Sequence, residues 1–258
     1  MKQSLLPSKP LVRHWHWYNS WLVYLGVIAW KILRGDQTFR LQYPLTEQSI
    51  VVDVGGYLGD WSQAIHDRYQ PKIYIFEPVP VFVEKLRHRF ANHKSIQIFA
   101  YGLAGQAERI KIKPTDDATS VFGEGPTQEA TPETTPEATL EIDLQPASQT
   151  FRSLGLNSID LLKLNIEGAE YALIADLIKS GYIRQVNNLQ VQFHHFVPGA
   201  RQLRQALHRE LSQTHRLTYS FPFIWENWQR LPLTVSSVKF SQPKSHHRQS
   251  SQGRPSEA

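Results

Sequence analysis

The stretch Val51-Val52-Asp53-Val54-Gly55-Gly56-Tyr57-Leu58-Gly59-Asp60 decides how this chain of 258 residues folds. Its first half is a short β-branched apolar run, which is typical of a strand buried on both faces of a sheet. Glycines follow at once in the pattern Asp-x-Gly-x-x-x-Gly, and glycine tolerates positive φ and a close approach of a ligand to the backbone. We therefore predict a buried strand, a ligand-binding turn and then a helix that begins at Asp60.

The same alternation of strand and helix patterns continues along the chain. Repeated β-α units imply a mostly parallel sheet with right-handed crossovers and helices on both faces, so the predicted fold class is α/β and Rossmann-like. The run 108–113 is expected to form a further strand that pairs with 140–144. The predicted strands of the seven-stranded sheet are 50–54, 72–76, 95–101, 159–164, 188–193, 216–221 and 233–240, and the predicted helices are 60–69, 80–90, 169–179 and 201–211.

Composition suggests one α/β domain with extensions. The hydrophobic fraction of 41% is enough for a packed core and excludes a wholly disordered chain. We predict an aromatic-rich helical extension over 1–47, the Rossmann-like domain over 48–240 with an acidic Thr/Pro/Glu loop at 123–139, and a basic tail over 241–258. Because part of the net charge of +5 comes from that tail, we expect no nucleic-acid partner.

The N-terminal extension contains an apolar run at 21–30 that stops at Lys31. Ten helical residues span about 15 Å, roughly half of a hydrocarbon core, so a membrane span is not expected. Two alternatives stay open: a helix packed on the domain, or peripheral contact with a membrane through 15–34, a segment rich in tryptophan and tyrosine. The absence of cysteine excludes disulfides, thiolate nucleophiles and cysteine-ligated metals, and fits a cytoplasmic location.

Ligands of open α/β sheets bind beyond the carboxyl ends of the strands. Glu77 stands there after the second strand, about 20 positions beyond the glycine turn, where a carboxylate can accept both hydroxyls of an adenosine ribose. Asp60, at the helix start, would oppose a pyrophosphate but suits the sulfonium and ammonium of S-adenosylmethionine, unless it only complements the helix dipole. We favour the methyl donor, with an NAD(P)-dependent oxidoreductase as the alternative.

Two later strand ends carry the candidate catalytic residues. Lys163 lies within an apolar run, where its ammonium needs an anion or carbonyl partner, either for function or as a structural ion pair. Asn165 and Glu167 follow at the strand's carboxyl end. After the next strand comes His194, whose unperturbed pKa near neutrality suits a proton acceptor, although a purely structural histidine fits equally well.

Four segments together resemble the FkbM family of methyltransferases: Val-Val-Asp-Val-Gly-Gly-Tyr-Leu-Gly-Asp (51–60), Ile-Phe-Glu-Pro-Val-Pro (75–80), Leu-Leu-Lys-Leu-Asn-Ile-Glu-Gly-Ala-Glu (161–170) and Leu-Gln-Val-Gln-Phe-His (189–194). Their order is that of the family, over roughly residues 48–225. The resemblance implies a class I methyltransferase fold, S-adenosylmethionine as cofactor, and O-methylation of a hydroxyl on a sugar, glycan or secondary metabolite.

The resemblance also implies roles for particular residues. Asp53, Gly55, Gly56 and Gly59 would border the donor, Glu77 would take its ribose, and the loop at Asp117 would close over the site. Asn165 stands where the family usually has aspartate, and Gln192 where glutamate is common. Glu167 and His194 are therefore the candidate bases, and a catalytically silent, membrane-peripheral binding protein is a second alternative.

Overall fold

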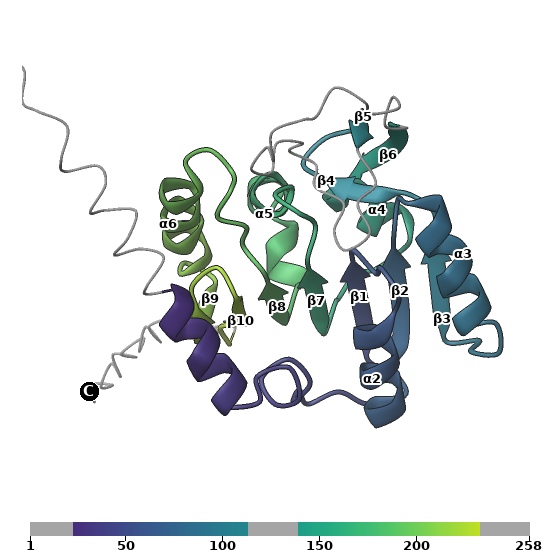
Figure 1. Ribbon diagram of the computed structural model, residues 1–258, viewed down its shortest axis with the longest axis horizontal. Helices are drawn as coiled ribbons and strands as arrows, with labels where there is room; N and C mark the ends of the chain where they lie inside the picture. Colours follow the sequence, from purple (N-terminus) through teal and green to yellow (C-terminus); the bar gives the residue numbers. More distant parts are fainter. Residues whose placement is uncertain (1–22, 113–138, 233–258) are drawn as a thin grey trace, which may run out of the picture.

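A seven-stranded sheet forms the centre of the structure, a computed structural model that describes residues 23–112 and 139–232 (Figure 1). Its strand order is β3-β2-β1-β7-β8-β10-β9, and only β10 runs antiparallel to its neighbours. The predicted class I methyltransferase-like α/β fold is confirmed. The strands are β1 (Ile50–Val54), β2 (Lys72–Phe76), β3 (Ile96–Phe99), β7 (Leu161–Leu164), β8 (Asn188–Val191), β9 (His215–Phe221) and β10 (Trp225–Arg230).

Helices cover both faces of this sheet because successive residues of each buried strand point to opposite sides. Val51 of β1 packs in the core beneath the first two helices, whereas Val52 and Val54 belong to the core beneath the later ones. The helices are α2 (Asp60–Tyr69) and α3 (Pro80–Arg89) on the first face, and α4 (Ala147–Ser153), α5 (Glu170–Lys179) and α6 (Ala200–Leu211) on the second, with a 3-10 turn at Tyr182–Gln185.

A second, three-stranded sheet lies beyond the upper ends of β1 and β2 in Figure 1. It contains β4 (Gly102–Ala104), β5 (Glu108–Ile112) and β6 (Leu140–Pro146). The predicted pairing of β5 with β6 is confirmed; the two strands run antiparallel, with Ile110 opposite Ile142. Neither β4 nor α4 was predicted, because a strand of three residues and a helix of seven are too short to show a period.

The last strand of the large sheet is β10, which the sequence analysis missed. The predicted strand at 233–240 lies outside the described residues. The sequence of β10, Trp-Glu-Asn-Trp-Gln-Arg, lacks the apolar alternation of a strand. The strand nevertheless buries Glu226, whose carboxylate pairs with Arg204 and His208 of α6. Paired charges of this kind make a polar sequence compatible with a buried strand.

The described part of the N-terminal extension, residues 23–47, packs on the domain, which is the first of its two predicted arrangements. Residues 23–32 are helical, and the Trp30 ring meets the Phe221 ring of β9 edge-on with centroids 5.1 Å apart. Farther along, Tyr43 and Leu45 join the core beneath α2. Within the described ranges, no helix is both long and apolar enough to cross a membrane.

Candidate active site

The glycine turn after β1 holds three strand ends together. Gly55 has a φ of 82°, and a Cβ at this position would lie 2.1 Å from the backbone oxygen of Asn165, so any side chain is excluded. The Gly55 amide donates a hydrogen bond of 2.9 Å to the backbone oxygen of Phe76. The turn thereby brings the carboxyl ends of β1, β2 and β7 into one place, at the point where the strand order reverses.

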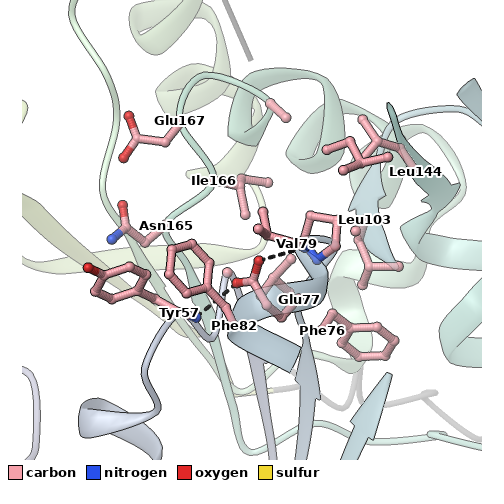
Figure 2. Close-up of a pocket in the computed structure, with 16 residues that line it drawn as sticks. Tyr57, Phe76, Glu77, Val79, Phe82, Leu103, Leu144, Asn165, Ile166 and Glu167 are labelled. Carbon is pink, nitrogen blue, oxygen red and sulfur yellow. Dashed lines mark hydrogen bonds between the residues drawn. The ribbon is translucent and has the colours of Figure 1, made fainter. Parts of the chain in front are cut away.

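Glu77 follows β2 directly and points into the resulting cavity, as Figure 2 shows. Its two carboxylate oxygens accept hydrogen bonds from the backbone amides of Tyr57 (2.9 Å) and Val79 (3.0 Å). Burial raises the pKa of Glu77, and these two hydrogen bonds together with the charge of Lys163 oppose the rise. Each oxygen has a further lone pair, so the orientation of the carboxylate is fixed while it can still accept ligand hydroxyls.

The cavity has one apolar side and one polar side. The rings of Tyr57 and Phe82 meet edge-on with centroids 4.6 Å apart, and Leu103, Ile142 and Leu144 of the small sheet complete the apolar wall. Most ligand sites combine such a wall with a few convergent polar groups. The lining residues are Val54, Gly55, Tyr57, Phe76, Glu77, Pro78, Val79, Phe82, Gly102, Leu103, Ile142, Leu144, Asn165, Ile166, Glu167 and Ala169.

The polar side comes from the loop after β7. The side-chain oxygen Oδ1 of Asn165 is buried and has no hydrogen-bond partner among residues 23–112 and 139–232. Such an atom costs free energy unless a ligand satisfies it. Glu167 has a φ of 48° and Tyr57 has a φ of 51°, and both values are strained for a residue with a side chain. Backbone strain of this kind concentrates at ligand-binding and catalytic sites.

His194, after β8, lies between two carboxylates. Its Nε2 is 3.4 Å from Oε1 of Glu167, and its Nδ1 is 3.2 Å from Oε1 of the fully buried Glu170. Burial by itself lowers the pKa of His194, but the hydrogen bonds and charges of Glu167 and Glu170 outweigh it and raise the pKa to about 9. The ring is therefore an imidazolium at neutral pH, which makes it a partner of Glu167 rather than a free base.

This arrangement predicts a pH-dependent contribution to stability. A histidine whose pKa rises from 6.5 to about 9 on folding stabilises the protein fully below pH 6.5 and loses that contribution as the pH rises through 9. Urea unfolding of the wild type and His194→Gln should therefore show a difference on the order of 3 kcal/mol at pH 6 that vanishes near pH 10. The matched control is His195→Gln, at the exposed neighbour. A pH-independent difference for His194→Gln would contradict the assignment.

Asp53 and Lys163 form a buried ion pair outside the cavity, which favours the structural interpretation of Lys163. Lys163 Nζ is 2.8 Å from Asp53 Oδ1 and 2.8 Å from the backbone oxygen of Gly55, and Ser62 Oγ donates to the other Asp53 oxygen at 2.6 Å. Neither side chain lines the cavity. Both stand on the strand face that packs against α2, and through Lys163 and the Gly55 oxygen they stabilise the glycine turn.

The remaining predicted residues divide in the same way. Gly55, Glu77, Asn165 and Glu167 line the cavity, whereas Gly56 and Gly59 do not. These two glycines are needed for packing. A Cβ at Gly56 would clash with Ile75 of β2, and a Cβ at Gly59 would clash with Leu86 of α3 and with Phe90, which follows α3.

Two further predicted residues remain. Asp117 is outside the described residues. Asp60 is exposed and pairs with Arg89 of α3 at 2.5 Å, which favours its interpretation as a helix-start residue. Tyr57 stood within the glycine turn and could have been selected, but nothing in the sequence marked the apolar wall residues Phe82, Leu103, Ile142 and Leu144.

Comparison with known proteins identifies the domain. Residues 53–221 match the family model described as the methyltransferase FkbM domain. No curated protein sequence matches the chain. Similar solved structures include a fibrillarin pre-rRNA processing protein of Methanococcus jannaschii (9% identity over 73% of this chain and 69% of that one, TM-score 0.44). An rRNA methylase of Streptococcus thermophilus is 11% identical over 73% of this chain and 90% of that one, with a TM-score of 0.41. A precorrin-6y C5,15-methyltransferase of Geobacter metallireducens is 10% identical over 72% of this chain and 73% of that one, with a TM-score of 0.40.

Proposed function

The chain belongs to the FkbM family of S-adenosylmethionine-dependent methyltransferases, and from that premise we propose that it methylates a hydroxyl of a sugar, glycan or secondary metabolite. Family membership replaces the alternative of a nicotinamide-dependent oxidoreductase. The observation that carries the proposal is the Glu167 carboxylate, which lies in the cavity wall and is held by the imidazolium of His194. A carboxylate held in place at a binding site suits removal of a proton from a neutral hydroxyl.

The geometry supports one orientation of the donor. The carboxylate of Glu77, with both oxygens fixed by backbone amides, would accept the ribose hydroxyls. The apolar wall around Phe82 and Leu144 would cover the adenine, and the close approach permitted at Gly55 would admit the methionine portion. Bound there, S-adenosylmethionine would supply a methyl group whose carbon is electron-poor because it is bonded to the sulfonium sulfur, and S-adenosylhomocysteine would be the leaving group.

The acceptor hydroxyl would then lie on the side of β7 and β8. Asn165 carries a neutral amide that cannot take a proton, but its unpartnered Oδ1 can accept a hydrogen bond and orient the hydroxyl. Glu167 would receive the proton, and His194 would act as a positioning residue that holds this carboxylate. Orientation of the two reactants contributes most of the rate, and proton removal contributes less.

A substitution at Glu167 tests this assignment. A screen with labelled S-adenosylmethionine against sugars, glycans and hydroxylated metabolites identifies the acceptor. With that acceptor, Glu167→Gln should lower kcat by about a hundredfold, because the amide cannot receive the proton. Calorimetry should show unchanged affinity for S-adenosylhomocysteine. The control Glu84→Gln, at an exposed glutamate of α3, should leave both quantities unchanged. A kcat of Glu167→Gln close to that of the wild type would exclude Glu167 as the base.

A further inference from the structure

The helix over residues 23–32, the unlabelled purple helix of Figure 1, has two apolar faces. Its inner face carries Trp30, which is 5% exposed and packs on Phe221 and Phe39. Its outer face carries Leu25, Ile28 and Ile32, which are 46%, 37% and 74% exposed. Spacings of three and four residues place these side chains on one side of the helix, so they form a continuous apolar stripe that faces away from the domain.

Basic residues outnumber acidic residues around this stripe. Residues 1–35 contain five basic residues and no acidic residue. Two of the basic residues, Lys31 and Arg34, are exposed on the described helix and the turn after it. The sequence before the helix adds Trp15, Trp17 and Trp21, a residue type that prefers the headgroup region of a bilayer. Asp36, just after residues 1–35, is the first acidic residue, and it pairs with Arg40 and accepts a hydrogen bond from Trp30 Nε1. The stripe therefore has an excess of cations around it and is complementary to an anionic, partly apolar surface.

We propose that the outer face of helix 23–32 binds an anionic membrane surface and lies in its interface. The helix is too short to cross, because ten residues rise about 15 Å against a hydrocarbon core of roughly 30 Å. Apolar side chains buried at the acyl boundary, together with basic residues near the headgroups, are the two terms that hold interfacial helices. A second copy of this face would bring its Lys31 and Arg34 close to the same two residues of the first copy, which disfavours self-association.

The topology places the start of this helix near the edge of the sheet where the cavity lies. Because β10 runs antiparallel to both β8 and β9, β9 ends at the edge where β8 ends. The turn after β9 contains Ile224, and a Cβ at Gly26 would lie 3.1 Å from its Cδ1. The same turn meets the segment after β8, where the rings of Phe223 and His195 are 6.2 Å apart. The start of the helix is therefore linked to the segment after β8 through the turn after β9.

Co-sedimentation with vesicles tests the proposal. Full-length protein should pellet with vesicles that contain phosphatidylglycerol and phosphatidylcholine, and much less with phosphatidylcholine alone. The double variant Ile28→Glu, Ile32→Glu should lose binding by roughly tenfold or more, because it places charges where apolar groups would be buried. The matched control Val81→Glu changes a 54% exposed apolar residue on α3 and should bind as the wild type does.

A charge-reversal variant and a measurement of oligomeric state complete the test. Lys31→Glu with Arg34→Glu should abolish the preference for anionic vesicles. Unchanged thermal unfolding and donor affinity would show that the variants are folded. Wild-type protein that stays in the supernatant, or a double variant that pellets as the wild type does, would overturn the proposal. So would a wild-type dimer, seen by sedimentation velocity, that becomes a monomer in the Ile28→Glu, Ile32→Glu variant.

Discussion

Replacement of Glu77 by alanine is expected to lower the affinity for S-adenosylhomocysteine by about a hundredfold to a thousandfold. The carboxylate is nearly fully buried, so each hydrogen bond that it accepts from a ribose hydroxyl contributes about 1.5 to 3 kcal/mol. Alanine also leaves the amides of Tyr57 and Val79 without their acceptor. Isothermal titration calorimetry of S-adenosylhomocysteine into the wild type and the variant measures the loss directly.

Two controls separate ribose binding from damage to the turn. Glu77→Gln keeps the shape and one side-chain oxygen, so it should retain the fold and lose part of the affinity. Glu84→Ala, at an exposed position on α3, should bind the donor as the wild type does. Wild-type affinity in Glu77→Ala would show that the ribose lies elsewhere, whatever the family resemblance implies.

Replacement of Lys163 by methionine should destabilise the fold by about 3 to 5 kcal/mol, because it leaves the fully buried Asp53 without its cation. The Gly55 oxygen also loses its hydrogen bond from Lys163 Nζ. Urea unfolding at pH 7 measures the difference in unfolding free energy.

The matched comparison removes both charges of the buried pair. The double variant Asp53→Asn, Lys163→Met removes both charges of this pair. It should be less destabilised than Lys163→Met alone, because an unpaired buried charge is costlier than no charge at that site. If Lys163→Met cost less than about 1 kcal/mol, or if the double variant were the less stable of the two, the pair would not support the glycine turn as described.

The sequence alone predicts most of the large sheet, for a physical reason. Strands such as β1 and β7 are buried on both faces and are apolar except for Asp53 and Lys163, which pair with each other, and the helices near them begin or end at glycine or proline. The prediction failed at β10, where a buried anion, Glu226, is neutralised by α6. Tertiary contacts between distant residues decide such a strand, and no local pattern records them.

The candidate site divides along similar lines. Glu77, Asn165 and Glu167 were predicted because they follow strands, and the carboxyl ends of parallel strands meet at one edge. Asp53 and Lys163 lie within strands, where alternation turns their side chains toward α2 and away from the cavity. The apolar wall from the small sheet had no sequence signal, because β4 and β6 reach the cavity only through the folding of the whole chain.

The most direct test of the proposed reaction is the fate of the methyl group. Full-length protein is incubated with S-adenosylmethionine that carries a deuterated methyl group and with the acceptor that the screen identifies, and NMR and mass spectrometry locate the label. We expect a methyl ether on a hydroxyl oxygen, formed by the wild type and lost with Glu77→Ala. Label on nitrogen or carbon would contradict O-methyl transfer. Donor binding without transfer to any hydroxyl would instead indicate a catalytically silent binding protein and contradict the proposed function.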